Sequence, residues 1–309
     1  MNESLRATRS CDVDSPLVSI GVPVYNGESY LRIALESLLK QTMPDFEVII
    51  SDNASTDATA SICHEYLRRD PRFRYERQPQ NLGAAANYNR TFELARGRYF
   101  KWLAHDDWCE PECLAKCVEA FENADDSCVL VYSDTFVVDP EDNYMYSDPD
   151  RLLPTHRRPV ARLVHTLWNL NMANAAFGLV RAESLERTRL IGPFVASDYV
   201  LMVELSILGT FAYVDEPLVG RRWHPGGSRQ EANPTVLDVQ AWFDGKERRK
   251  FILPTRLRLP AEYVRSCLRM SVSWTTRFSC AAVVLPTLLL RRLRVVMGRA
   301  RETWSKGSD

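Results

Sequence analysis

Short apolar runs alternate with longer amphipathic segments over the first 135 residues of the chain. Residues 17–24 and 99–104 are largely apolar, as in buried strands, whereas residues 29–41 repeat their apolar positions with the period of a helix. The strands that we expect are 17–24, 46–51, 73–77, 99–104 and 128–133, and the helices are 29–41, 56–69, 83–95 and 111–121. Such alternation predicts an α/β fold with a mostly parallel, doubly wound central sheet flanked by helices.

The pattern weakens after this half. Residues 135–175 contain four prolines among charged residues, and we expect an irregular loop there that lies over the site. A second α/β stretch follows over 174–219, with a helix that starts at Ser197-Asp198-Tyr199 and a strand over 210–214.

Charge is distributed unevenly along the chain. The 309 residues carry 39 Lys+Arg and 40 Asp+Glu, yet residues 1–247 hold 25 basic and 37 acidic residues, and residues 248–309 hold 14 and 3. Within this basic tail, residues 278–290 lack charge but are too few to cross a bilayer, which takes about 20 apolar residues. We expect a partly amphipathic helical tail that lies on an anionic membrane surface, and the alternative is a helix packed on the domain or on a partner subunit.

The eight cysteines form no pattern of a disulfide framework. Cys109, Cys113 and Cys117 recur at helical spacing, where free thiols on a half-buried face are favoured over a metal site. The N-terminal residues lack a basic segment followed by an apolar core, so we expect no signal peptide and a cytoplasmic location, peripheral on the inner face of the plasma membrane.

Polar side chains follow three of the predicted strands, where ligands bind to parallel sheets. They lie in the segments Pro23-Val24-Tyr25-Asn26, Ser51 to Asp57, and His105-Asp106-Asp107. The adjacent carboxylates of the third segment repel each other, and a divalent cation on a substrate phosphate would relieve the repulsion. The alternative is that each group serves as a turn or helix cap.

The order of these segments resembles the inverting family 2 glycosyltransferases, which have the nucleotide-diphospho-sugar binding fold called GT-A. The similarity spans roughly residues 17–229. It is carried by residues 18–26, by Ser51-Asp52-Asn53-Ala54-Ser55-Thr56-Asp57, by Asn81-Leu82-Gly83 and by His105-Asp106-Asp107.

The resemblance implies a role for each matching residue. Pro23, Tyr25 and Asn26 would border the base and ribose, and Asp52 would accept a hydrogen bond from the base. Asp106 would lie near the ribose or sugar, Asp107 would bind Mn²⁺ or Mg²⁺, and Asp198 would be the general base. His224 would bind the metal or the diphosphate, and the donor-binding set also includes Ser55, Asn81 and Ser228.

Three positions depart from the family pattern. Ser197-Asp198 replaces a common Glu-Asp pair, and Tyr88-Asn89 replaces an Arg-Asn pair, which removes a phosphate-facing cation. Arg222-Trp223 is present, but Val219 stands where processive synthases carry Gln, which favours transfer of a single sugar.

We therefore expect a metal-dependent glycosyltransferase that moves one sugar from a nucleoside-diphosphate sugar, with UDP favoured, to a glycan or glycolipid acceptor. The expected parts are a disordered 1–15, a nucleotide-sugar half 16–135, an acceptor half 136–250 and the tail 251–309. The alternatives are a nucleotidyltransferase, for which a cationic glycine-rich loop is missing, and a non-enzymatic nucleotide-binding scaffold. A dehydrogenase would need Gly-X-Gly-X-X-Gly, which does not follow the first strand, and no nucleic-acid partner is expected.

Overall fold

The computed structural model of the chain describes residues 15–148, 151–224, 236–245 and 253–305. Residues 1–14, most of the segment that we expect to be disordered, lie outside this part.

The first half contains the predicted elements, each within a few residues of its expected bounds, and one short strand, β5, that the sequence did not predict. In chain order they are β1 (Val18–Val24), α1 (Leu31–Leu39), β2 (Phe46–Asp52), α2 (Thr59–Arg69), β3 (Phe73–Arg77), α3 (Ala84–Glu93), β4 (Tyr99–Trp102), β5 (Trp108–Cys109) and α4 (Cys113–Asn123). Both β1 and β2 are buried along their whole length, as strands covered on both faces must be.

The second half departs from the expectation of an irregular segment over 135–175, which is wrong. Its elements are β6 (Cys128–Val138), β7 (Tyr144–Asp148), α5 (Pro159–Asn169), the 3₁₀ helix η2 (Asn174–Phe177), β8 (Leu179–Arg181), α6 (Ala182–Glu186), α7 (Ser197–Leu208), β9 (Thr210–Arg222), α8 (Val236–Asp244), α9 (Thr255–Arg269) and α10 (Trp274–Ser305). Pro159 occupies the first turn of α5, where its missing N–H costs nothing, so this proline begins a helix instead of preventing one.

One sheet joins the two halves, with strand order β3-β2-β1-β4-β8-β6-β9-β5 and β7 paired to β6. Strands β3, β2, β1 and β4 are mutually parallel, and the β1–β2 register ends at Val24 opposite Asp52. Strand β8 runs antiparallel between β4 and β6, and β6 pairs with β9 in parallel. The short β5 pairs antiparallel with β9, Trp108 opposite Gly220, which carries the end of β9 toward Asp107.

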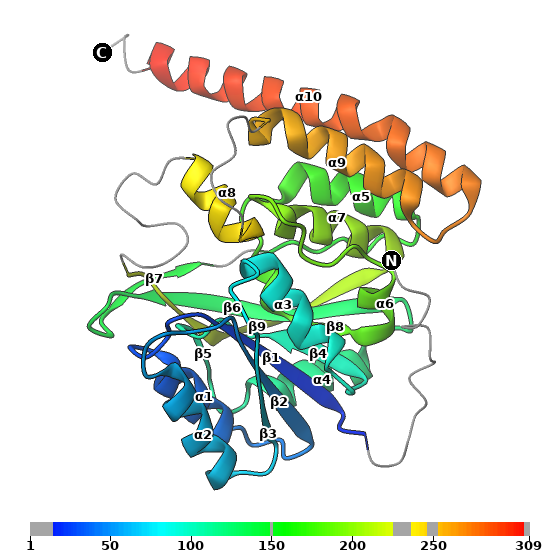
Figure 1. Cartoon of the computed structure of the whole chain (residues 1–309). Helices are drawn as coiled ribbons and strands as arrows, with labels where there is room; N and C mark the ends of the chain where they lie inside the picture. The colour runs from blue at the N-terminus through cyan, green and yellow to red at the C-terminus, as the bar shows by residue number, and fades with distance from the viewer. Residues whose placement is uncertain (1–14, 149–150, 225–235, 246–252, 306–309) are drawn as a thin grey trace.

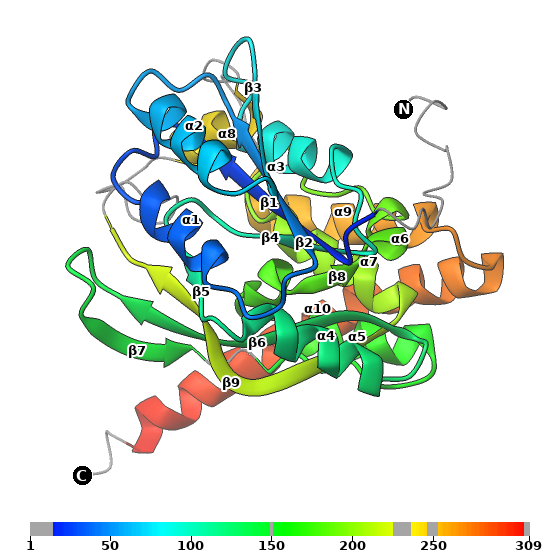
Figure 2. The same cartoon turned by 90° about the horizontal axis from the view of Figure 1, so that it is seen from below.

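Helices cover both faces of the sheet (Figure 1). Figure 2 shows α1, α2 and α4 on the face turned away from α10, where their apolar side chains share a core with β1 and β2. On the other face α5 and α7 pack beneath α9 and α10, through a separate core that includes Leu163, Val203, Cys267 and Val284. The inner face of the basic tail therefore packs on the domain. In the described ranges, no helix is long and apolar enough to cross a bilayer.

The cysteines of the described residues are free thiols in the interior. Cys109, Cys113 and Cys117 are all buried, and Cys113 forms hydrogen bonds with the other two. All three thiols belong to the core beneath the sheet, but only Cys113 and Cys117 lie on α4, because Cys109 is part of β5.

Candidate active site

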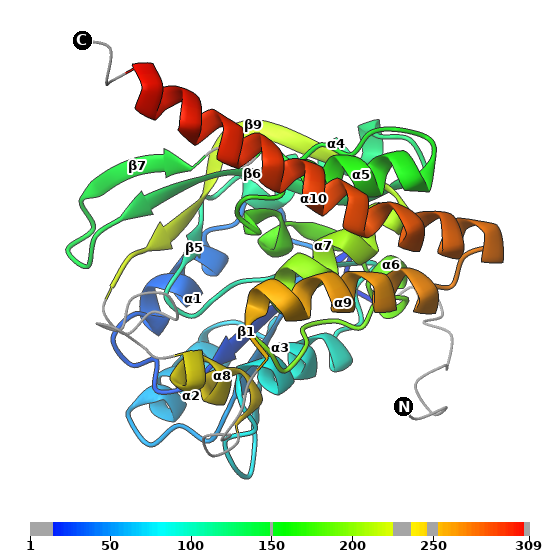
Figure 3. The same cartoon turned by 90° about the horizontal axis from the view of Figure 1, so that it is seen from above.

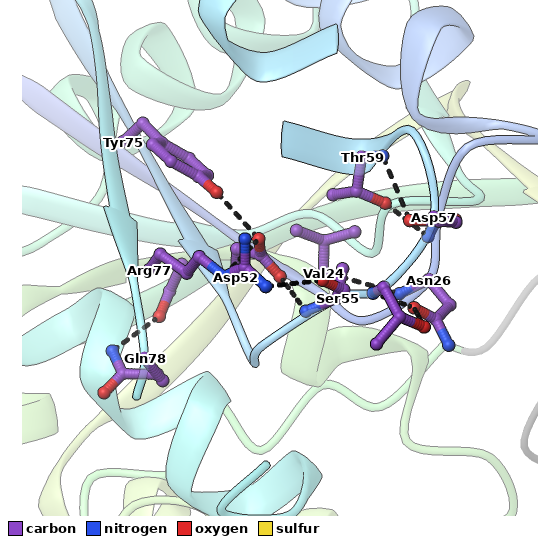
Figure 4. A network of polar contacts seen from close by, with 12 residues as sticks. Val24, Asn26, Asp52, Ser55, Asp57, Thr59, Tyr75, Arg77 and Gln78 are labelled. Carbon is purple, nitrogen blue, oxygen red and sulfur yellow. Dashed lines mark hydrogen bonds and ion pairs between the residues drawn. The ribbon is translucent and has the colours of Figure 1, made fainter. Parts of the chain in front are cut away.

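The turns after β1 and β2 are joined by hydrogen bonds. The backbone N–H of Asn26 donates to Ser55 Oγ at 2.9 Å, and the N–H of Thr56 donates to Asn26 Oδ1 at 2.9 Å (Figure 4). Asn26 has a φ of 50°, a left-handed conformation that asparagine tolerates better than most residues. The structure thus brings Asn26 and Ser55 together as predicted, beside the exposed ring of Tyr25.

Asp52 is fully buried at the end of β2 and organises this corner. Its Oδ1 accepts the N–H of Ser55 at 2.8 Å, and its Oδ2 accepts the hydroxyl of Tyr75 at 2.7 Å, as Figure 4 shows. Arg77 Nε lies 3.9 Å from Oδ2, while Arg77 Nη2 donates to the carbonyl of Ser55. Burial, followed by the hydrogen bond to Asp52, raises the pKa of Tyr75, which keeps this phenol neutral.

Asn81 closes the rim beyond β3. Its Oδ1 accepts Asn53 Nδ2 and the N–H of Gly83, both at 2.8 Å. Gly83 has a φ of 84°, and a Cβ there would lie 2.3 Å from the backbone nitrogen of Gly245. Only glycine allows this approach, which seats the end of α8 on the predicted donor pocket.

Asp106 and Asp107 lie in the turn between β4 and β5. His224 Nε2 lies 2.9 Å from Asp106 Oδ2, and the backbone N–H of Arg222 donates to Asp107 Oδ1 at 3.1 Å. The pairing of β5 with β9 produces both contacts, because it places residues 115 and 118 positions later beside the carboxylates. The sequence-predicted Asp106, Asp107 and His224 are therefore brought together.

The two neighbouring carboxylates have opposite electrostatic environments. Burial, followed by the charge of Asp106, raises the pKa of Asp107 well above that of an ordinary aspartate. Burial acts in the same direction on Asp106, but His105 and the His224 hydrogen bond outweigh it and lower the pKa of Asp106. The pair thus holds one stable negative charge and a second that is costly without a cation.

Arg222 fixes the end of β9, a role that sequence reasoning missed. Its guanidinium lies 4.7 Å from the centre of the Tyr30 ring and 5.4 Å from that of Trp108. Tyr30 also contacts the imidazole of His224, at 4.7 Å between ring centres. Arginine stacked between aromatic rings is a stable arrangement away from water. In the sequence, the Arg-Trp pair at 222–223 was the feature that could have indicated this role of Arg222.

Two buried or half-buried cations lie on the inner side of Asp107. A cavity of about 20 Å³, room for one water, is lined by Asp107, Lys101 and Arg221. Lys101 Nζ donates to the carbonyl of Phe177, and Arg221 Nη1 donates to Asn174 Oδ1 at 2.8 Å. Sequence reasoning missed Lys101. Lys101 stands in an otherwise apolar strand, which was the available signal.

Asp198 lies in the first turn of α7, as predicted, where the helix dipole favours a carboxylate. The phenol of Tyr88, on α3, is sensitive to the charge of Asp198 and of the carboxylate pair. Burial, followed by the charges of Asp106, Asp107 and Asp198, raises the pKa of Tyr88. A neutral tyrosine therefore stands at the position where the family pattern has arginine.

A metal would need ligands from the substrate as well as from the protein. Within the parts of the chain that the structure describes, no group of three or more His, Cys, Asp and Glu side chains could hold a metal ion. The carboxylates of Asp106 and Asp107 nevertheless fit a hard cation, which proteins bind through one or two carboxylates together with substrate phosphates. The raised pKa of Asp107 marks the place where such a cation would be most stabilising. Ser228, the remaining predicted residue, lies outside the described residues.

Comparison with known proteins identifies the family. The sequence model of glycosyl transferase family 2 matches residues 19–188, more than half of the chain.

The chain belongs to glycosyl transferase family 2.

The family 2 match contains the rim residues and the Asp106-Asp107 pair, but it ends before Asp198, Arg222, His224 and the C-terminal helices. Chondroitin synthase of Escherichia coli is 30% identical over 227 residues, which cover 73% of this chain and 31% of the synthase. The chain thus spans less than a third of that relative.

Solved structures show the same GT-A fold. The Staphylococcus aureus TarS 1–349 complex with UDP-GlcNAc superposes with a TM-score of 0.63 at 17% identity, covering 87% of this chain and 72% of TarS. The mannosyltransferase PcManGT of Pyrobaculum calidifontis, in complex with GDP-Man and Mn²⁺, gives 0.53 at 17% identity, covering 95% and 80%. At this identity the likeness establishes the fold alone.

Proposed function

We propose that the family 2 domain transfers one sugar, with inversion and with a divalent metal, from a UDP-sugar to a hydroxyl acceptor. The observation that supports this most is the junction of Asp106 and Asp107 with the end of β9, beside the hydrogen-bonded rim of Asn26 and Asp52. The rim suits a nucleoside, and the carboxylates suit the diphosphate that joins it to a sugar.

The first cluster provides the donor pocket of the proposal. Pro23, Tyr25 and Asn26 would contact the base and ribose, where the exposed Tyr25 ring offers a stacking surface. Asp52 would accept a hydrogen bond from the base. Because each oxygen of Asp52 already accepts one internal hydrogen bond, the base would use a remaining lone pair.

Asp107, with Asp106 or His224 beside it, would hold Mn²⁺ or Mg²⁺. When bound, the cation supplies positive charge that stabilises the departing diphosphate. Two groups of the chain stabilise the ionised form of Asp107 that would bind the cation. The positive charge of Arg221 favours it, and the backbone N–H of Arg222 donates a hydrogen bond to its Oδ1. His224 would orient Asp106 or donate to a phosphate oxygen.

Asp198 would be the general base. The acceptor oxygen attacks the anomeric carbon, the bond from that carbon to the diphosphate oxygen breaks with its electron pair on the diphosphate, and the acceptor proton passes to Asp198. Its place in the first turn of α7 favours the ionised form that a base requires. Direct displacement of this kind inverts the anomeric centre without a covalent intermediate.

We place the acceptor among glycolipids and cell-surface glycan precursors, with the enzyme peripheral at the cytoplasmic face of the plasma membrane. Val219 in place of Gln, in the segment ending at Arg222-Trp223, supports single transfer over polymerisation. Residues 136–250 would contribute the acceptor half and 16–135 the donor half.

The test measures nucleoside diphosphate released from UDP-, GDP- and dTDP-sugars with and without Mn²⁺. Wild type is expected to release diphosphate from UDP-sugars with Mn²⁺, whereas Asp107→Ala is expected to lose about 10³-fold in rate, equivalent to several kcal/mol. Asp126→Ala, an exposed acid remote from the site, is the control. Equal turnover of wild type and Asp107→Ala would overturn the metal-carboxylate part, and release of pyrophosphate would indicate nucleotidyl transfer.

A further inference from the structure

Helices α9 and α10 lie side by side (Figure 3), on the outside of the helical layer and furthest from the sheet (Figure 1). The inner face of α10 is held firmly, because Cys280 and Val284 are fully buried and Arg291 donates to the carbonyls of Leu167 and Leu170. These contacts fix the orientation of α10, so the same side chains of the helix always face outward.

That outer face is apolar. Five large side chains on it are between 47 and 68% exposed: Trp274, Phe278, Leu285, Leu289 and Leu293. Their spacing of four, seven, four and four residues places them in one stripe opposite the buried positions. At 1.5 Å per residue the stripe is about 28 Å long. An exposed apolar stripe of this length, on a helix whose other face is buried, indicates a surface that binds a membrane or another molecule.

Helix α9 extends the same surface, with Leu257 and Leu268 exposed by 58 and 40%. We call the outer plate the apolar stripe of α10, together with Leu257 and Leu268 of α9 and the exposed arginines of both helices. It consists of Arg256, Leu257, Arg265, Leu268, Arg269, Trp274, Phe278, Leu285, Leu289, Arg292, Leu293 and Arg294.

The outer plate is strongly basic. Residues 253–297 contain eight arginines, five of which belong to the outer plate, and a single acid, Glu262. That carboxylate is mostly buried and forms an ion pair with Arg189 at 2.7 Å, so it does not neutralise the surface. An apolar stripe flanked by arginines is the composition of helices that lie in the headgroup layer of anionic bilayers.

We propose that the outer plate docks flat on an anionic lipid bilayer, with its apolar stripe at the boundary of headgroups and acyl chains and its arginines on lipid phosphates. This deepens the proposed peripheral association by naming the surface, and it does not depend on the reaction. A second copy of the chain fits less well, because a symmetric contact would bring two arginine-rich plates together and the outer plate, as defined by its residues, includes no acid. A spanning arrangement is excluded for the described helices by their composition.

The experiment measures cosedimentation of the full chain with vesicles of phosphatidylcholine alone or with 30% phosphatidylglycerol. Wild type is expected to bind the anionic vesicles and to be released by high salt. The double substitution Leu285→Glu/Leu289→Glu should weaken binding by about 30-fold or more. Arg265→Gln/Arg269→Gln should weaken it by about tenfold on anionic vesicles only.

The matched control is Met145→Glu/Tyr146→Glu, which introduces the same charges at exposed apolar positions of β7 and should bind as wild type does. Circular dichroism should be unchanged in every variant, and diphosphate release in solution should be unchanged in the outer-plate variants, which separates this proposal from the proposed reaction. Wild type that ignores anionic vesicles, or leucine variants that bind undiminished, would overturn it. So would a wild-type dimer in sedimentation velocity that Leu285→Glu/Leu289→Glu dissolves, because the plate would then be an interface between copies.

Discussion

The donor rim and the carboxylate centre are built in different ways. The rim joins residues at most 30 positions apart, through hydrogen bonds such as Asn26 to Ser55, Thr56 to Asn26 and Tyr75 to Asp52. The centre joins residues 115 and 118 positions apart, because Asp107 and Asp106 meet Arg222 and His224 only through β9. The rim is thus determined within the first βαβ units, whereas the centre requires the whole sheet to be in place.

Asp198→Asn should have the largest effect on activity, although it changes neither the rim nor the carboxylate centre, because it removes the proposed general base. We expect kcat to fall by about 10²–10⁴-fold, the usual contribution of a general base. Donor affinity and Mn²⁺ affinity should stay within about twofold of wild type. Steady-state kinetics with a soluble acceptor would measure the loss, with Glu183→Gln as the exposed control. A variant that retains kcat would remove Asp198 from the mechanism.

Arg222→Ala tests the dependence of the centre on β9. The variant leaves the Tyr30 and Trp108 rings without the cation between them, and we expect the free energy of unfolding to drop by about 2–3 kcal/mol. Arg77→Ala, a half-exposed arginine of the rim, should cost less than about 1 kcal/mol. Urea unfolding followed by circular dichroism measures both, and equal losses would contradict the difference between the two regions.

Asp52→Asn sharpens the account of the rim. The amide keeps the size of the side chain but weakens the hydrogen bonds to Ser55 and Tyr75. We expect KM for the donor to rise about tenfold with little change in kcat, which corresponds to the loss of one charge-assisted hydrogen bond. An unchanged KM in initial-rate measurements would show that the rim does not bind the nucleoside.

Glu47→Gln gives the smallest expected effect, because Glu47 anchors the same strands at the far end from the site. Burial opposes ionisation of Glu47, but Arg96, Ser19 and Arg74 outweigh it and lower its pKa. A lowered pKa contributes stability above the unfolded value of about 4.3, and this stability is lost as the pH falls through the folded value. The variant should therefore be about 1 kcal/mol less stable at pH 7, and the difference should shrink below pH 4. A difference that grows on acidification would contradict the sign.

Sequence alone predicts the first half well, because its apolar periods are regular and its connections are short. The same regularity predicts that Asn26, Asp52 and Asp106 share one edge of the sheet. The sequence could not predict α5, because a proline normally ends a helix. Pro159 is compatible with one only because it occupies the first turn of α5. The sequence also could not predict that Arg222 lies between Tyr30 and Trp108, because β9 reaches them only through its pairing with β5.

The central claim is that Asp107 binds a divalent cation together with the donor's diphosphate. Isothermal titration of Mn²⁺ into wild type and Asp107→Asn, each with and without UDP, tests it most directly. The account predicts Mn²⁺ binding in wild type that UDP strengthens at least about tenfold, and loss of both effects in Asp107→Asn. Mn²⁺ affinity that is the same in both proteins, with the same response to UDP, would contradict it.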